Sequence, residues 1–241
     1  MMRSPRWPQI INGVILMKKA KATVLVGFVL FALFLVFTYL AGHVDVAPIG
    51  PNGSMVGFSA INGAFRDTVG LNKFWYYLTE VYGYLSLLLM AAFAFLGVYK
   101  LIKFKSIKKV DPEIICLGVF YVIVLGIYVF FEKFIVNFRP VILDAEEGLE
   151  ASYPSSHIML IVFVMGSTAV AIASMVRKET VSYAKAIVLT CDIIGITGIV
   201  GRLLSGVHWL TDIFAGLVAA TSLLIIFQGV IGIINEKRET K

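Results

Sequence analysis

The chain consists of long apolar stretches separated at intervals by short polar or basic clusters. A helix needs roughly 20 apolar residues to cross a bilayer, and six stretches are about that long or longer. They are residues 23–42, 74–102, 114–138, 157–176, 186–204 and 209–234. The pattern therefore predicts an all-α fold, a bundle of six transmembrane helices.

The composition agrees with a membrane protein, because 59% of the 241 residues are apolar, more than a soluble globular domain carries. With most of its length in spans, a chain of this size has room for one bundle and no separate soluble domain. We expect residues 1–241 to form a single integral membrane domain. Cys116 and Cys191 lie inside apolar stretches, which is typical of packing residues rather than of a disulfide or a metal site.

Basic residues occupy every second connection between the expected spans. Cytoplasmic loops are enriched in Lys and Arg, so we expect both termini in the cytoplasm, as a segment over residues 1–21 and a tail over 235–241. Residues 43–73, 139–156 and 205–208 then face the outside. The net charge of +6 reflects this topology rather than nucleic-acid binding. The basic groups are Arg3, Arg6, Lys18, Lys19 and Lys21; Lys103, Lys105, Lys108 and Lys109; Arg177, Lys178 and Lys185; and Lys237, Arg238 and Lys241.

Two segments leave alternatives open. The basic N-terminus and the apolar stretch behind it have the order of a secretory signal, but the stretch is long and no small-x-small cleavage site follows, so we favour an uncleaved span. Met17 offers an alternative start, which would make residues 1–16 dispensable. The outer amphipathic loop at 43–73 mixes Gly, Pro and Asn with apolar residues. It is either a short surface helix covering the site or a plain loop.

Three polar clusters lie at the outer ends of the spans. Ionisable groups beside lipid are costly, and so they indicate function. The charge count that orients the spans makes no use of these clusters, yet it places all of them on one face, which favours one shared pocket. The remaining histidine, His43, carries no motif and is expected at the surface. The clusters are Arg139-Pro140, then Pro154-Ser155-Ser156-His157, then Arg202 with His208 and Asp212.

The clusters hold what phosphoryl transfer needs, which is fixed cations and N–H donors around the phosphate oxygens. The guanidinium groups of Arg139 and Arg202 can bind phosphate bidentately and remain charged. The turn at Ser155 and Ser156 leads into a helix whose N-terminal N–H groups favour an anion, although helix capping alone would also explain these serines. We expect all four residues to bind phosphate.

His208 and Asp212 are four residues apart, so on a helix they would share one face and the carboxylate would hold the imidazole in one tautomer. An oriented imidazole is a competent nucleophile that forms a phosphohistidine, which water then hydrolyses. His157, from another span, would protonate the leaving alkoxide as general acid. These three residues are the expected catalytic groups.

The clusters resemble the signature of the type 2 phosphatidic acid phosphatase superfamily of membrane lipid phosphatases, written KxxxxxxRP, PSGH and SRxxxxxHxxxD. The spacing from Arg202 through His208 to Asp212 fits fully, and six spans with motifs on the third to sixth also agree. The resemblance implies that His208 is the nucleophile, Asp212 its orienting partner and His157 the general acid. It implies a phosphate cradle and an enzyme that needs no metal and no cofactor. The cradle is Arg139, Arg202, Ser155 and the Ser156 backbone.

Three positions depart from the signature. Ser156 replaces the motif glycine but keeps the backbone N–H, and Gly201 replaces the motif serine, which removes one hydroxyl. Glu132 stands seven residues before Arg139, where the family has lysine. Lys133, one residue later, would lie roughly 120° off that face of a helix and would reach the site only by snorkelling. Glu132 could instead pair with an arginine.

Other acidic residues are candidates as well. Asp192 lies within the fifth span, where an ionisable group is a functional candidate, although a hydrogen bond inside the bundle is the favoured explanation. The acidic outer loop is expected to be solvated, with substrate selection or contact with a divalent ion as the alternative. This loop contains Asp144, Glu146, Glu147 and Glu150.

Two other classes of function remain as alternatives. A metal-dependent membrane hydrolase could use His157, His208 and Asp212 as ligands, but two nearby arginines would oppose a dication. A transporter for a phosphorylated solute could hold the anion with arginines, but the sequence has no repeated half and no broken helix.

The favoured hypothesis is a lipid phosphatase in a multi-pass bacterial plasma membrane, with its active site on the extracytoplasmic side. Its partners would be the bilayer and a lipid phosphate, either a phosphomonoester or a diphosphate. Phosphatidic acid, phosphatidylglycerol phosphate and undecaprenyl diphosphate are the candidate substrates.

Overall fold

The structure is a computed structural model that describes residues 7–146, 148–176 and 182–239. In these ranges no strand forms, and six helices, all except the short α2, are long and apolar enough to cross a membrane. The predicted all-α fold with six spans is confirmed. The elements, with η for a 3-10 helix, are α1 (Trp7–His43), η1 (Pro51–Gly53), α2 (Ser59–Val69), α3 (Lys73–Phe104), η2 (Ile107–Lys109), α4 (Pro112–Lys133), α5 (Ser156–Met175), α6 (Ser182–Ser205) and α7 (Leu210–Glu239).

Several helix boundaries differ from the predicted ones by four or more residues, at the starts of α1 and α6 and at the ends of α4 and α7. Helix α1 begins at Trp7 instead of near residue 23, and α4 ends at Lys133 instead of at residue 138. Pro140 disfavours the helical conformation only of Arg139, the residue before it, and the chain has already left the helix at Phe134. Arg139 therefore lies in the connection between α4 and α5 and not at a helix end.

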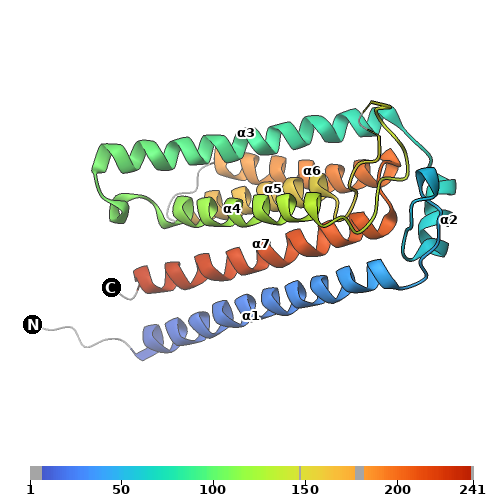
Figure 1. The fold of residues 1–241 in the computed structure, drawn as a ribbon. Coiled ribbons are helices and arrows are strands. Elements are labelled where there is room, and N and C mark those ends of the chain that lie inside the picture. The colour runs from blue at the N-terminus through green and yellow to red at the C-terminus, as the bar shows by residue number, and fades with distance from the viewer. Residues whose placement is uncertain (1–6, 147, 177–181, 240–241) are drawn as a thin grey trace, which may run out of the picture.

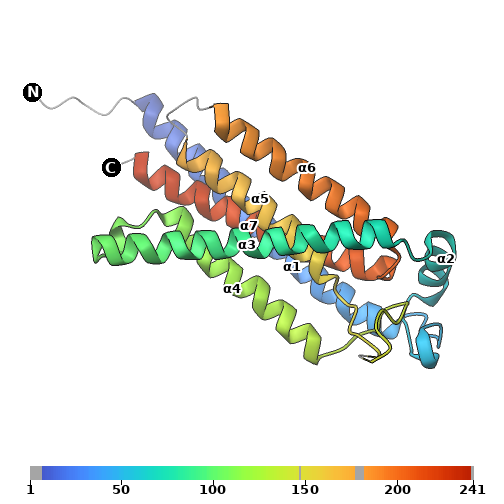
Figure 2. The ribbon, with the colours of Figure 1, turned by 90° about the horizontal axis from the view of Figure 1, so that it is seen from above.

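The long helices form one bundle (Figure 1). Helix α5 packs against α3, α4, α6 and α7, whereas α1 packs along α7. Figure 2 shows α4 and α6 on opposite sides of α5. The start of α1, η2 and the end of α7 lie at one end of the bundle, and α2 and the connection from α4 to α5 lie at the other (Figure 1). The polar clusters thus occupy the end opposite η2 and its lysines.

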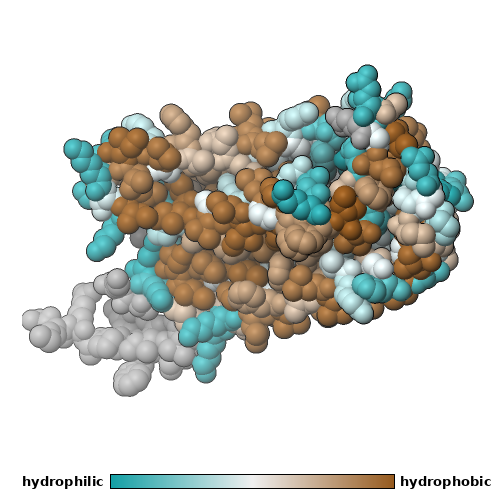
Figure 3. All heavy atoms as spheres, viewed as in Figure 1, coloured by the Kyte–Doolittle hydropathy of each residue, from teal (hydrophilic) through white to brown (hydrophobic). Residues whose placement is uncertain are grey.

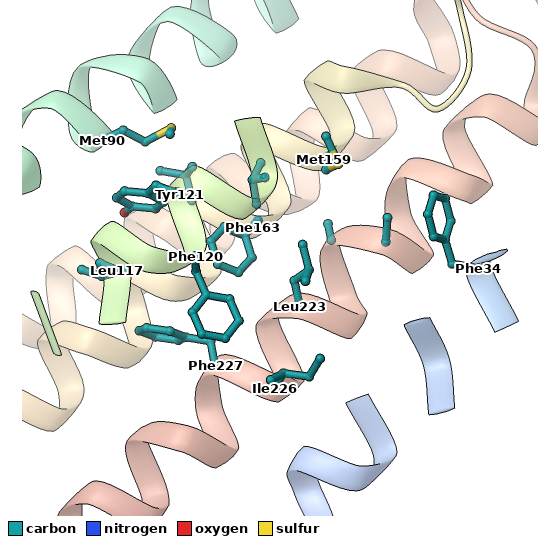
Figure 4. Packing of buried hydrophobic residues seen from close by; sticks show 14 of the residues in the cluster. Phe34, Met90, Leu117, Phe120, Tyr121, Met159, Phe163, Leu223, Ile226 and Phe227 are labelled. Atoms are coloured by element: carbon teal, nitrogen blue, oxygen red, sulfur yellow. The ribbon is translucent and has the colours of Figure 1, made fainter. Parts of the chain in front are cut away.

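Apolar side chains cover the middle of the bundle in Figure 3, and hydrophilic residues gather toward its two ends. Inside, aromatic rings from α4, α5 and α7 pack together (Figure 4). The ring of Phe163 stacks on Phe120 with centroids 6.0 Å apart and meets Phe227 edge to face at 6.4 Å. Helix association in a bilayer depends on such packing, because lipid tails are as apolar as the side chains. This core fixes α5, whose first residues reach the polar clusters.

Helix α2 lies across the end of the bundle that holds the clusters (Figure 1). It is attached to the start of α7 through the buried Asn62, whose Nδ2 donates to Thr211 Oγ1 at 2.9 Å and whose Oδ1 accepts from the Thr211 N–H at 3.2 Å. The neighbouring Ile61 points outward and is 52% exposed. Segment 43–73 therefore contains a helix, and its contact with the membrane surface stays a prediction.

Candidate active site

Arg202 lies at the centre of a buried polar cluster between α3, α5, α6 and the start of α7. Its Nη2 is 3.1 Å from His157 Nδ1 and 3.3 Å from His208 Nε2. Its Nη1 donates to Thr79 Oγ1 at 2.9 Å and to Glu80 Oε1 at 3.2 Å. A guanidinium has only donors, so both ring nitrogens that face it act as acceptors. The structure thus brings Arg202 and the two predicted catalytic histidines together.

His208 lies in the turn before α7, and the expectation that it shares a helix face with Asp212 is wrong. Its Nδ1 is 3.8 Å from Asp212 Oδ2, which is too long for a direct hydrogen bond. The hydroxyl of Ser152 fills this gap: Oγ lies 3.0 Å from His208 Nδ1 and donates a short hydrogen bond to Asp212 Oδ2. Since Ser152 gives its proton to the carboxylate, it accepts from His208, and the proton of the neutral ring is assigned to Nδ1.

The carboxylate of Asp212 is fully buried and held from several sides. Its Oδ1 accepts from Asn137 Nδ2 at 2.7 Å, and its Oδ2 accepts from the backbone N–H of Trp209 at 3.0 Å in addition to Ser152. Its backbone carbonyl accepts from the N–H of Ser155 at 2.9 Å. Asp212 therefore joins the start of α7 to the start of α5 and to the connection between α4 and α5.

That connection folds back on itself as a short antiparallel pair. An isolated bridge joins Phe138 to Ala151, the Arg139 N–H donates to the Glu150 carbonyl at 3.0 Å, and the Ser152 N–H donates to the Asn137 carbonyl at 3.0 Å. Alternate residues of an extended chain lie on the same face. The pairing therefore turns Asn137, Arg139 and their opposite residues to one side, toward the cluster.

The turn that presents His208 depends on Gly206. This residue has φ +70°, and a Cβ there would lie 1.8 Å from the backbone oxygen of Gly70. The Asn72 N–H donates to the Ser205 carbonyl at 3.0 Å, so the chain that enters α3 lies against this turn. Only glycine satisfies both the left-handed conformation and the close approach.

Burial lowers the pKa of His208 well below its usual value of 6.5, and the charges of Arg202 and Arg139 lower it further. The side chain is only 2% exposed. A neutral ring at pH 7 agrees with its hydrogen bonds, in which Nδ1 donates and Nε2 accepts. Nε2 therefore carries a lone pair, which accepts from Arg202 here and can reach an electrophile that displaces this contact.

Several buried donors around Arg202 have no hydrogen-bond partner among the described residues: Nε and Nη1 of Arg139, Nε of Arg202 and Oγ of Ser155. Arg139 Nε lies 3.1 Å from Glu150 Oε2, so the two form an ion pair without the alignment of a hydrogen bond. Ser155 stands at the N-cap position of α5, but its side chain makes no capping bond. Buried polar groups are nearly always satisfied, and this set of unpaired donors suits an anion.

The other predicted residues have different surroundings. Ser156 is the first residue of α5, and it lines a small pocket together with His208 and Glu132. Lys133 is exposed and does not line this pocket. In the described part of the chain the carboxylates paired with the two site arginines are Glu150 and Glu80, so the suggested pairing of Glu132 with an arginine is not observed.

The remaining acidic residues divide between site and surface. Asp192 lies on an exposed face of α6, and the favoured hydrogen bond inside the bundle is wrong. In the acidic outer loop, Asp144 and Glu146 are exposed as expected, but Glu150 pairs with Arg139. Glu147 lies outside the described residues.

Four residues of the cluster were not predicted from the sequence: Thr79, Glu80, Asn137 and Ser152. Glu80 carried a usable signal, because it is an ionisable residue inside an expected span, the same property that marked Asp192. Ser152 lies only two residues before the Pro154 motif. Asn137 and Thr79 had no signal of their own, since their roles depend on partners far along the chain.

A metal centre built on the two histidines conflicts with this geometry. The Arg202 guanidinium lies between His157 Nδ1 and His208 Nε2, so a fixed positive charge occupies the space that a dication would share. Among the described residues, no group of three His, Cys, Asp or Glu side chains is placed to hold a metal ion.

Comparison with known proteins places this geometry in a family. The model of the PAP2 superfamily matches residues 113–232, about half of the chain, from α4 to α7. The crystal structure described as the first transmembrane PAP2 type phosphatidylglycerolphosphate phosphatase, from Bacillus subtilis, superposes with a TM-score of 0.53 and 17% sequence identity. The match covers 88% of this chain and 96% of that one, and at this identity the likeness concerns the fold. No curated protein matches the chain. This family match contains every predicted site residue, and it shows that the chain belongs to the PAP2 superfamily.

Proposed function

We propose that this protein is a lipid phosphatase that hydrolyses a lipid phosphomonoester or diphosphate, without a metal ion, through a phosphohistidine at His208. One observation carries the proposal: the guanidinium of Arg202 lies between the facing nitrogens of His157 and His208, at 3.1 and 3.3 Å. A phosphate that binds this guanidinium is within reach of a nucleophile on one side and a proton donor on the other.

The unpaired donors define the phosphate cradle. Arg139 and Arg202 supply fixed positive charge and N–H groups, and Ser155 supplies a hydroxyl. The first N–H groups of α5, at Ser156 and His157, have no acceptor within the helix, and the helix dipole adds a partial positive charge. These groups bind the non-bridging oxygens, where charge is greatest in the transition state of phosphoryl transfer.

In the first step, the Nε2 lone pair of His208 attacks phosphorus while the bond from phosphorus to the lipid oxygen breaks. Once a phosphate replaces His157 Nδ1 at Arg202 Nη2, His157 takes up a proton at Nδ1 and gives it to that oxygen, so a neutral lipid alcohol leaves, or a lipid monophosphate when the substrate is a diphosphate. The positive charge that develops on His208 is stabilised through its Nδ1 proton by Ser152 and Asp212.

In the second step, water attacks the phosphohistidine and gives a proton to His157. The bond between Nε2 and phosphorus breaks, inorganic phosphate leaves, and both histidines return to their starting forms. Each cycle consumes one water molecule and requires no oxidant, reductant or metal ion.

Charge and position support the proposed membrane face and substrate class. The site lies at the bundle end opposite η2 and its lysines (Figure 1), so the distribution of basic residues favours the extracytoplasmic side. Phosphatidic acid, phosphatidylglycerol phosphate and undecaprenyl diphosphate all present a terminal phosphate to such a site, with the lipid chain beside an apolar bundle.

The test is phosphate release from a panel of these three lipids by purified protein, with and without a chelator. We expect release from at least one lipid at an unchanged rate in chelator, complete loss in His208→Ala, and an acid-labile phosphorylated protein in wild type alone. Loss of activity in chelator would favour the metal-dependent alternative. If wild type releases phosphate from none of the lipids, the proposal that the protein is a lipid phosphatase is excluded.

A further inference from the structure

Glu80 is a charged residue in the third turn of α3, remote in sequence from the three clusters. A single carboxylate oxygen, Oε1, lies 3.0 Å from His157 Nε2 and 3.2 Å from Arg202 Nη1. The side chain is 22% exposed. We propose that Glu80 is a positioning residue for the general acid, because it holds His157 with the opposite ring nitrogen facing the nucleophile. This inference rests on the proposed function.

The two nitrogens of His157 have separate partners, which fixes the orientation of the ring. Nε2 meets Glu80, whereas Nδ1 meets Arg202 Nη2, the atom that also lies 3.3 Å from His208 Nε2. A carboxylate has only acceptors, so it fixes the Nε2 proton of His157. Nδ1 is then the nitrogen that exchanges a proton with the leaving group and later with water.

Helix α3 also supports the ring sterically, one turn beyond Glu80. A Cβ at Gly83 would lie 2.9 Å from His157 Cδ2 and 3.1 Å from its Nε2. The imidazole therefore lies directly on the helix backbone, and only a residue without a side chain leaves room for it. Glu80 and Gly83 together hold the His157 ring in position, one by an ion pair and the other by leaving room for it.

The charges around His157 show why a carboxylate is needed. Arg202 from α6 and Arg139 from the connection between α4 and α5 both act on this ring, and His208 lies beyond Arg202. A protonated imidazole in the same place adds a third positive charge. Among the other nearby carboxylates, Glu150 pairs with Arg139 and Asp212 is bound by Ser152, Asn137 and Trp209. Within the described part of the chain, the carboxylate in contact with His157 is that of Glu80.

A purely structural role, in which Glu80 only anchors Arg202, makes a different prediction. Loss of an arginine anchor weakens phosphate binding for every substrate. Loss of the general acid matters only when the leaving group needs a proton. An alkoxide from a lipid needs one, whereas p-nitrophenolate is stable without protonation, so the two roles separate by leaving group.

The experiment compares kcat/KM for dioctanoyl phosphatidic acid and for p-nitrophenyl phosphate in wild type, Glu80→Gln, Gly83→Ala and Glu150→Gln. General acid catalysis contributes about 100-fold or more. We therefore expect Glu80→Gln and Gly83→Ala to lose at least about 10-fold on the lipid and much less on the aryl phosphate. His157→Ala should show the same pattern more strongly. Glu150→Gln instead removes the ion-pair partner of Arg139. It should change kcat/KM equally for both substrates.

Equal losses of Glu80→Gln on the two substrates would overturn the inference and leave Glu80 as an anchor of Arg202. An unchanged kcat/KM of Glu80→Gln on both substrates would overturn the inference as well. If Glu80→Gln does not fold, Gly83→Ala decides, because it displaces the ring and leaves both ion-pair partners in place. Failure of the proposed function looks different, since wild type would then release no phosphate or His208→Ala would remain active.

Discussion

His208 and Asp212 are joined through a third residue: Nδ1 and Oδ2 are 3.8 Å apart, and the hydroxyl of Ser152 contacts both. The family signature contains the histidine and the aspartate, and the orienting hydrogen bond passes through a serine outside it.

Ser152→Ala should lower kcat for phosphate release by about 100-fold, the order of magnitude of losing one organising group at a charged site. The KM should change little, because Ser152 does not belong to the phosphate cradle. Ser222→Ala is the matched control, since this serine is equally buried and bonds only to the Ala219 carbonyl of its own helix. A Ser152→Ala enzyme with wild-type kcat would show that the link through Ser152 has no catalytic role.

The lowered pKa of His208 predicts how stability depends on pH. In the unfolded chain this histidine takes up a proton as the pH falls through about 6.5, whereas in the folded protein it stays neutral to a lower pH. The unfolded state thus binds more protons, and the free energy of unfolding falls by up to about 1.4 kcal/mol per pH unit below 6.5.

Melting temperatures of wild type and His208→Gln in detergent between pH 7.5 and 5.5 measure how much stability His208 costs on acidification. Wild type should lose more stability than the variant on acidification, because the variant lacks the group while both retain His157 and His43. If the melting temperatures of the two proteins fall equally as the pH is lowered, the pKa of His208 is not lowered by folding.

Asn137→Ala should destabilise the protein by about 1–3 kcal/mol, because it leaves an oxygen of the buried Asp212 carboxylate without its donor. Asn235→Ala is the control at the opposite end of the bundle, where the amide donates to the neutral Ser174 hydroxyl in a half-buried place. A smaller loss of melting temperature and full activity are expected for the control. Equal losses in the two variants would contradict a special role for the carboxylate contact.

Gly206→Ala should destabilise the turn before His208 far more than Gly53→Ala destabilises η1. Both glycines have φ near +70°, but a Cβ at Gly53 meets no atom within 4 Å, whereas at Gly206 it meets the Gly70 oxygen at 1.8 Å. Backbone strain alone costs about 1 kcal/mol, and the difference between the two melting temperatures measures the steric clash. Equal melting temperatures for the two variants would show that the chain leading into α3 can move away from the turn.

The spans and the convergence of Arg202, His157 and His208 could be predicted because each depends on a local pattern. Apolar length marks the helices, and charge alternation together with span ends brings the clusters to one end. The end of α4 could not be placed, because residues 134–138 are apolar enough to continue the helix, and the chain instead leaves the helix and pairs residues 137–139 with residues 150–152.

The contacts that organise the site were harder to foresee. Ser152, Asn137 and Glu80 act through partners 56 to 122 positions away in the chain, and no periodicity encodes such pairs. The spacing of His208 and Asp212 gave the correct neighbours for the wrong reason. A helix was expected to align them, whereas a helix start and a serine bring them together.

The packing of α1 along α7 has a consequence for biogenesis. Translation runs from the N-terminus, so the first helix enters the bilayer long before its partner is made. Until then, both of its faces must tolerate lipid. Apolar residues on its finished outer surface, such as Leu25, Phe28 and Leu33, and on its inner one, such as Phe34, meet that need. Helix α7, which is synthesised after α1, completes this pair and also carries Asp212, so the packing of α1 and the assembly of the reactive centre coincide.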